Sequence, residues 1–146
     1  MPQQKSQLYV HSIYGFTGAN TTSSEAYENN EKLLANVFQA ADMIGGSAAM
    51  LVGGDLNVAS QDSSVLCRMA EWWHDVLDTY GDNSNTYESG NNTSRIDMLW
   101  ANRSALSLIG GAHKKDFRIA GGHHPIAAIL AGAAQLAAGP VWERPK

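Results

Sequence analysis

The sequence of 146 residues contains a single cysteine, few charged side chains and no long apolar run. One cysteine, Cys67, excludes an internal disulfide framework and a cysteine-rich zinc module. Charged residues make up 16% of the chain, against about 25% in typical domains. With a net charge of −4, this composition argues against a simple basic nucleic-acid binder that relies on phosphate neutralisation alone.

Membrane and export signals are also missing from the sequence. No stretch reaches the roughly 18 apolar residues of a membrane span. Residues 1–7 lack the apolar core of a signal peptide. We therefore expect no membrane partner and an intracellular protein, either cytoplasmic or nuclear.

The first part of the chain predicts alternating strands and helices. Hydrophobic residues make up 44%, which is enough for the core of one domain. Residues 8–14 are rich in β-formers and predict a strand. Thr22 and Glu25 fit a capping box, and apolar side chains at helical spacing predict a helix that stops at Gly45. The continuous apolar run at 48–52 indicates a buried strand.

The second part predicts one more helix and then mainly strands. The helix begins at Ser63 or Ser64, and Cys67 and the pair Trp72 and Trp73 are expected to be buried on it. A long polar loop with one short strand follows at 78–92. Further strands are expected at 94–102, 106–109 and 125–130.

This order of elements predicts an α+β fold with layers of helix and sheet. Residues 1–131 form the expected domain. Residues 132–146 are rich in alanine and glycine before a proline-containing end, and we interpret them as a tail or linker.

Four polar clusters lie at the ends of predicted strands or in adjoining loops, where sites gather in layered folds. They are Tyr-Gly at 14–15, Gly-Asp-Leu-Asn at 54–57, Ser-Arg-Ile-Asp at 94–97 and Gly-His-His-Pro at 122–125. Each has an ordinary explanation when taken alone. Asp55 fits a turn, Asp97 fits an ion pair with Arg95, and Tyr14 fits a half-buried packing residue.

Taken in order, these clusters resemble the endonuclease/exonuclease/phosphatase superfamily of DNase I-like enzymes. The resemblance covers residues 8–131 and the C-terminal half of the family domain, including that of retrotransposon-type endonucleases. It implies a partial four-layer α/β/β/α sandwich. It also implies a metal-dependent phosphodiester hydrolase, above all an endonuclease-like domain acting on nucleic acid.

The resemblance assigns catalytic roles to four residues. Asp55 orients or deprotonates the attacking water, and Asn57 binds the phosphate or holds Asp55 in place. His123 donates a hydrogen bond to a phosphoryl oxygen. Asp97 accepts from the other ring nitrogen of His123 and so fixes its tautomer.

Two positions of the site leave alternatives open. Tyr14 resembles the family's phosphate-contacting tyrosine, and His11 on the same strand is the alternative. The family order Asp-His-x-Pro, read back from Pro125, makes His123 the catalytic histidine. A shift by one residue would give that role to His124 but would break the spacing to the proline.

Two departures from the family pattern bear on activity. Gly122 stands where the family has an aspartate, and glycine supplies no ligand. The family also holds Mg²⁺ or Mn²⁺ with a glutamate upstream of the tyrosine-bearing strand, where this sequence has only residues 1–7. Asp55 then remains as the metal ligand of an incomplete site, since Mg²⁺ usually takes one or two carboxylates with phosphate and waters.

Three functional interpretations follow. The chain is a truncated phosphodiester hydrolase of impaired activity, or a catalytically inactive remnant or binding module of the same family. The third is a phosphodiesterase or phosphatase acting on inositol phosphates or lipids with the same residues. Half of a four-layer sandwich would leave one sheet face uncovered, so we expect a homodimer or a missing N-terminal half to cover it.

Overall fold

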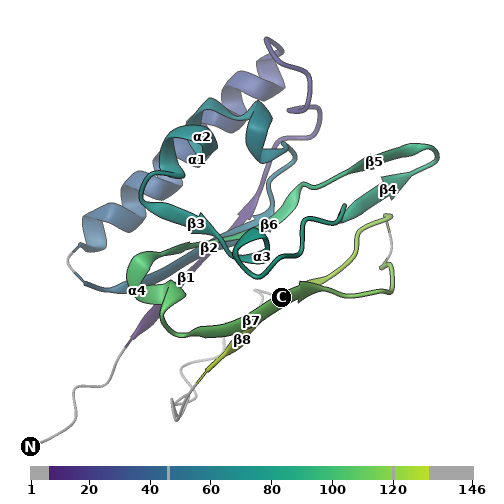
Figure 1. The fold of residues 1–146 in the computed structure, drawn as a ribbon. Coiled ribbons are helices and arrows are strands. Elements are labelled where there is room, and N and C mark those ends of the chain that lie inside the picture. The colour runs from purple at the N-terminus through teal and green to yellow at the C-terminus, as the bar shows by residue number, and fades with distance from the viewer. Residues whose placement is uncertain (1–6, 46, 120, 132–146) are drawn as a thin grey trace, which may run out of the picture.

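The computed structural model describes residues 7–45, 47–119 and 121–131, which form layers of helix and sheet (Figure 1). A central sheet has the strand order β1-β2-β6-β3. Its strands are β1 (Leu8–Tyr14), β2 (Ala49–Asp55), β6 (Asp97–Asn102) and β3 (Trp73–Asp75). β1 runs parallel to β2, and the β2–β6 and β6–β3 pairs are antiparallel. The α+β layered class expected from the sequence is confirmed.

One face of the central sheet is covered by α1 (Glu25–Ile44) and α2 (Ser64–Met69) (Figure 1). Leu34 and Phe38 lie four residues apart and therefore on one side of α1. Both are buried against Val52 of β2, in a core that α2 also joins. The helix layer thus holds β2 in place from one side.

Side-chain caps fix where both helices begin. Ser24 Oγ accepts the backbone N–H of Tyr27 at 3.0 Å, so Ser24 is the cap and the capping box predicted from Thr22 is wrong. Ser63 caps α2, as one of the two predicted starts requires. The Glu31 carboxylate accepts from the Ser63 hydroxyl and from the first two backbone N–H groups of α2. This contact ties α2 to α1.

The opposite face of the central sheet packs against a second, two-stranded sheet. Its strands are β7 (Ile109–Lys114) and β8 (Ile126–Leu130). The short helices α3 (Val76–Thr79) and α4 (Arg103–Leu106) complete this side, and a hairpin of β4 (Tyr87–Ser89) and β5 (Asn92–Ser94) extends beyond it (Figure 1). A second core lies between the sheets, formed by residues such as Leu51, Leu77 and Ile109.

The second helix is shorter than predicted, because helical spacing also fits a short helix followed by a strand. It ends at Met69, and Trp73 begins β3. Trp73 is buried with its ring 5.0 Å from that of Phe38, whereas Trp72 is 62% exposed. The core role predicted for both tryptophans is therefore right for one. Cys67 is exposed and not buried as predicted.

Smaller corrections concern the later strands. The strand expected at 106–109 is the end of α4 and the start of β7. The strand expected at 94–102 is divided into β5 and β6, with a break at residues 95–96. The tail or linker expected at 132–146 lies outside the described residues. Within the described ranges, no helix combines the length and apolar character needed to cross a bilayer.

Candidate active site

Asp55 and Asp97 lie next to each other because their strands are paired. Asp55 ends β2, Asp97 begins β6, and the two residues are direct partners in the antiparallel register. Directly opposite residues of paired strands point to the same face of a sheet. On β2 this is the face of Leu51, away from α1.

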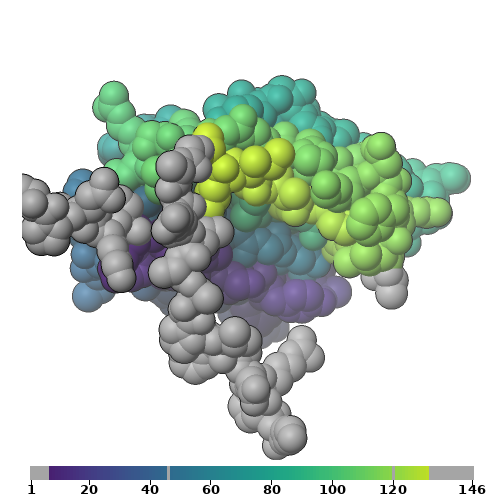
Figure 2. All heavy atoms as spheres, turned by 90° about the horizontal axis from the view of Figure 1, so that it is seen from below, coloured from purple at the N-terminus to yellow at the C-terminus, as the bar shows by residue number. Residues whose placement is uncertain are grey.

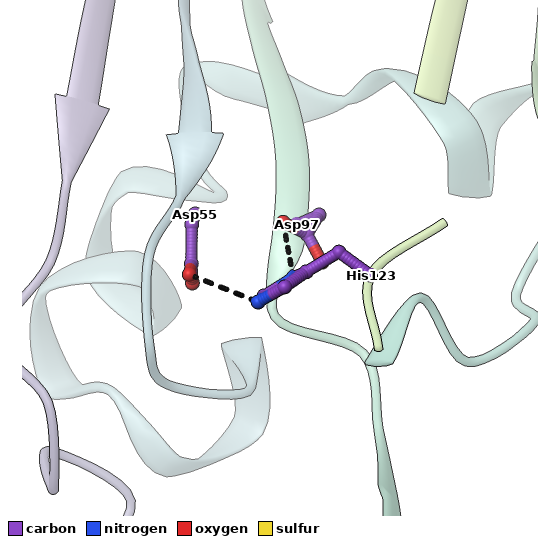
Figure 3. Close-up of side chains that lie close together, drawn as sticks. All are labelled: Asp55, Asp97 and His123. Carbon is purple, nitrogen blue, oxygen red and sulfur yellow. Dashed lines mark hydrogen bonds and ion pairs between the residues drawn. The ribbon is translucent and has the colours of Figure 1, made fainter. Parts of the chain in front are cut away.

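His123 completes a cluster with these two carboxylates (Figure 3). Its Nδ1 lies 3.1 and 2.9 Å from the two carboxylate oxygens of Asp97. An ionised carboxylate only accepts hydrogen bonds, so Nδ1 carries a proton and donates it. Nε2 lies 3.6 Å from the Asp55 carboxylate. The ring of Tyr87 packs against the imidazole with centroids 4.8 Å apart, so the orientation of His123 is fixed from two sides.

Burial raises the pKa of Asp55 above its ordinary value. The backbone N–H of Asn57, which donates to this carboxylate at 3.0 Å, lowers the pKa but does not cancel the effect of burial. The negative charge of Asp97 raises the pKa further, and His123 opposes it. A carboxylate with a raised pKa takes up a proton more readily than an exposed aspartate, which suits a general base.

Asn57 binds the neighbouring loop through its side chain. Its amide N–H donates to the Gly15 carbonyl at 2.8 Å, while its backbone N–H donates to Asp55. Its φ of +53° lies in the left-handed region, which asparagine adopts more readily than most residues. Asn57 therefore holds the ends of β1 and β2 together beside Asp55.

The alternation of β1 separates the two candidates for phosphate contact. Tyr14 is the register partner of Asp55 in the parallel pair and is 74% exposed. His11 is an odd number of positions away and therefore points to the helix-covered face, like the buried Ile13. The structure brings Tyr14, and not His11, to the face of Asp55.

The loop before β8 is held against β4. The Gly122 carbonyl accepts the backbone N–H of Glu88 at 3.0 Å. Gly122 has a φ of +85°, and a Cβ placed there would lie 2.2 Å from the Glu88 carbonyl oxygen. His124 is buried, with its Nδ1 2.9 Å from the Lys115 carbonyl. The loop thus directs His123, and not His124, to the two aspartates, and it leaves no space for a side chain at 122.

Asn30 is a site-supporting residue that the sequence analysis missed. It lies on the buried side of α1 and is 1% exposed. Its side chain accepts the Phe16 N–H at 2.9 Å and donates to the Leu56 carbonyl at 2.9 Å. These bonds join the loops that follow Tyr14 and Asp55. The available signal was a polar residue on the apolar stripe of the helix, between Tyr27 and Leu34.

Arg95, which one ordinary interpretation of the sequence pairs with Asp97, pairs with Asp75 instead. Two parallel hydrogen bonds of 2.6 and 2.7 Å join the guanidinium to the Asp75 carboxylate. The two side chains are 13% and 10% exposed. This bidentate pair ties the start of β6 to β3 and leaves Asp97 to His123.

The ion pair predicts that Arg95→Met destabilises the fold, because it strands the largely buried charge of Asp75. The expected loss in the free energy of unfolding is about 3 kcal/mol, measured by urea denaturation. The matched control is Arg118→Met, since Arg118 is 59% exposed in its 3.4 Å pair with Glu88. Its expected loss is within about 0.5 kcal/mol. Equal losses in the two variants would contradict a structural role for Arg95.

A cleft of about 660 Å³ opens beside the cluster, on the face of the central sheet away from α1. Asp55, Asp97 and His123 line one end, and apolar residues such as Val10 and Ile126 line the rest. Figure 2 shows this side from below, where blue to green atoms lie between the yellow β8 segment and the purple β1 segment. β1 is the edge of the sheet among the described residues. The three polar side chains therefore lie at one end of a cleft whose other walls are largely apolar.

The cluster has the donor chemistry of a metal site. Asp55, Asp97 and His123 each place one ligand atom within 4.8 Å of the others. Two carboxylates and an imidazole suit Mn²⁺ and similar transition ions, whereas Mg²⁺ prefers oxygen ligands alone. The residues present therefore fit a divalent ion. Asp55 is the carboxylate more available to it, because His123 Nε2 lies 3.6 Å away, beyond the ordinary length of a hydrogen bond.

Comparison with known proteins gives matches at the level of structure. No family model and no curated protein sequence matches the chain. The 3′ phosphatase NExo from Neisseria, bound to a product DNA hairpin, matches with a TM-score of 0.65 and 15% identity, over 84% of this chain and 61% of that chain. An AP endonuclease from Archaeoglobus fulgidus matches with a TM-score of 0.64 and 15% identity, over 84% and 61%.

A truncated TDP2 from Caenorhabditis elegans matches more distantly, with a TM-score of 0.54 and 14% identity over 82% of this chain and 52% of that chain. The chain therefore spans about 60% of the length of the NExo and AP endonuclease structures. At these identities the likeness establishes the architecture. The chain has a DNase I-like α+β fold.

Proposed function

We propose that the chain is a phosphodiester hydrolase of the endonuclease/exonuclease/phosphatase superfamily that acts on nucleic acid with a divalent metal. One observation carries the proposal. His123 is held 2.9 Å from Asp97 and 3.6 Å from Asp55 at one end of an open cleft. Phosphodiester hydrolysis needs an activated water and stabilisation of charge on the phosphoryl oxygens, and these side chains supply both.

In the proposed reaction Asp55 is the general base. Its raised pKa lets it accept the proton of the attacking water. The water oxygen forms the new P–O bond while the P–O bond to the leaving oxygen breaks, and the leaving oxygen takes its proton from solvent. Cationic His123 donates from Nε2 to a phosphoryl oxygen, and Asp97 stabilises the cation through Nδ1. The water and the phosphoryl oxygen enter between Nε2 and Asp55, which separate as the substrate binds.

Tyr14 and Asn57 complete the proposed site in different ways. The exposed Tyr14, on the same face as Asp55, offers its hydroxyl to a phosphate oxygen. Asn57 acts through its bonds to Gly15 and Asp55, which set the distance between Tyr14 and the base. Loss of the Asn57 side chain would therefore free the loop after Tyr14, while the backbone bond to Asp55 would remain.

In the protein without substrate, Asp55, Asp97 and the unprotonated Nε2 of neutral His123 would together hold the metal. In the reaction the ion would be held by Asp55, because the cationic form of His123 cannot be a ligand. When bound, the ion neutralises charge that develops on the phosphoryl group. We expect Mn²⁺ to raise the melting temperature of the protein more than Mg²⁺ at equal concentration, because one donor is an imidazole. Thermal unfolding with each ion measures this. A larger effect of Mg²⁺, or the same Mn²⁺ effect in His123→Ala, would contradict this donor set.

Nucleic acid is the proposed substrate class. The DNA bound to the NExo phosphatase, a protein of the same fold, supports it. The test is nicking of supercoiled plasmid DNA by the purified protein in Mn²⁺. We expect nicking by the wild-type protein and none by Asp97→Asn. Equal nicking by both proteins would assign the activity to a contaminant.

A second candidate function is a catalytically inactive remnant or binding module of the same family. Gly122 favours it, because its backbone conformation and its contact with Glu88 leave no space for the aspartate of the family pattern. This candidate predicts that the protein binds DNA in Mn²⁺ without cutting it. DNA binding by fluorescence anisotropy, together with the nicking assay, distinguishes the two functions.

We also propose that another polypeptide covers the face that carries Val10 and Ile126. Val10 is 63% exposed on an edge strand, and the chain spans about 60% of the length of two structures with the same fold. The cover is a second copy of the chain or an N-terminal half. Light scattering on the purified chain tests this: a dimer supports the second copy, and a monomer that Val10→Lys makes more soluble supports the N-terminal half. A monomer unaffected by this change contradicts both.

A further inference from the structure

Thr86 immediately precedes β4 and lies beside the break at residues 95–96, which separates β5 from β6. β3 covers only residues 100–102 of β6, and the chain leaves the sheet at residues 95–96. The backbone N–H groups next to this break therefore lack a strand partner on that side. The side chain of Thr86, which is completely buried, takes the place of the missing strand.

One oxygen atom holds two backbone groups at this point. Thr86 Oγ1 accepts the N–H of Ile96 at 3.2 Å and that of Asp97 at 3.0 Å. The backbone of Thr86 is also used, since its N–H donates to the Ser94 carbonyl at 2.9 Å and its carbonyl accepts the N–H of His124 at 2.7 Å. Thr86 thus contacts both segments that supply the Asp97–His123 pair.

We infer that Thr86 is a positioning residue that sets where Asp97 meets His123, an inference that rests on the proposed function for its catalytic meaning. The pair is held at 2.9 Å, and a shift of the Asp97 backbone would lengthen or break it. Position in the active centre matters steeply, because a misplacement of about 1 Å can cost about a hundredfold in rate. The threonine hydroxyl, and not its methyl group, is the part that matters.

The contributions of the Thr86 side chain and backbone can be tested separately. Thr86→Val keeps the shape and the bond from His124 to the carbonyl, but it removes the acceptor for Ile96 and Asp97. The loop before β8 also keeps its bond from Glu88 to Gly122. The variant therefore disturbs the Asp97 side of the pair and leaves the His123 side attached.

The test is the tautomer of His123, read from the ¹⁵N shifts of its ring nitrogens in the full chain without metal. In the wild-type protein, at a pH where the ring is neutral, we expect one tautomer with Nδ1 protonated. Thr86→Val is expected to give averaged ring shifts, and Thr86→Ser to restore the wild-type shifts. The matched control is Thr79→Val, which removes a hydroxyl that donates to the Asp75 carbonyl at 2.8 Å outside the site. It should leave the His123 shifts unchanged.

Two results would overturn the inference. The first is a folded Thr86→Val protein with wild-type ring shifts, or one that changes no more than Thr79→Val. The second needs no variant: an amide of Asp97 that exchanges with solvent as fast as an exposed loop amide in the wild-type protein has no bond to Thr86. Neither readout requires turnover, so the positioning role stands or fails independently of the proposed hydrolase activity.

If that activity holds, Thr86→Val should lower kcat about tenfold or more and leave KM unchanged.

Discussion

Asp55→Asn is expected to lower phosphodiester hydrolysis by about a thousandfold while leaving the protein at least as stable as the wild type at pH 7. Asparagine has nearly the same shape but cannot accept the proton of the attacking water. The amide keeps an acceptor for the backbone N–H of Asn57, so the local turn survives. Rate measurements in Mn²⁺ and urea denaturation at the same pH give both quantities.

The expected stability of Asp55→Asn follows from the direction in which the pKa of Asp55 is shifted. Burial raises the pKa of Asp55 in the folded protein, so the folded state holds this proton more tightly than the unfolded state. The ionised carboxylate therefore opposes folding at neutral pH, and this cost is relieved as the pH falls through the folded-state pKa. Asparagine removes the cost at every pH.

Asp82 supplies the control with the opposite sign. Hydrogen bonds from the backbone N–H of Lys114 and from the Ser84 hydroxyl lower the pKa of Asp82. Its ionised form stabilises the fold, and this contribution is lost as the pH falls through the lowered folded-state pKa. Asp82→Asn should therefore destabilise the protein at pH 7 and leave hydrolysis intact.

Asp55→Asn with more than a tenth of wild-type activity would exclude Asp55 as the base.

Gly122→Asp, which introduces the aspartate of the family pattern, is expected to destabilise the protein by more than about 3 kcal/mol and to give no increase in activity. The new Cβ would lie 2.2 Å from the Glu88 carbonyl oxygen, at a φ of +85° that side chains rarely adopt. Relief of this overlap requires the loop to leave β4. His123 would move with it, away from Asp97.

Gly90→Asp is the matched control for this change. Gly90 also has a positive φ, of +59°, but nothing lies within 4 Å of its added Cβ. Its expected cost is about 1 kcal/mol, from backbone strain alone. Urea denaturation of both variants separates strain from overlap. A Gly122→Asp protein that is as stable as Gly90→Asp, or more active than the wild type, would show that the loop can adopt the family conformation.

The sequence predicted the parts of the site that are encoded locally. Asp55 follows a continuous apolar strand, and Asp97 begins an alternating one, so both positions at strand ends were readable from short segments. The fold class followed from the same order of strands and helices. The order of the motifs then indicated His123 as their partner, although its contact with Asp97 crosses 26 positions of sequence.

The remaining features depend on contacts that no local pattern contains. Helical spacing continued through Trp73, but its pairing with Asn102 makes that segment a strand. Arg95 pairs with Asp75, and not with Asp97, which is nearer in sequence, because β3 lies beside β6 in the sheet. The hydroxyl of Thr86 replaces a strand partner, a role that only the tertiary structure creates.

The most direct test of the account is hydrolysis of a simple phosphodiester, bis(p-nitrophenyl) phosphate, by the wild-type chain and by His123→Ala. This substrate does not depend on DNA recognition, so it reports on Asp55, Asp97 and His123 alone. We expect turnover that saturates with Mn²⁺ in the wild-type protein and falls at least about a hundredfold in the variant. The same rate in both folded proteins, with or without Mn²⁺, would contradict the assignment of this cluster as a hydrolytic centre.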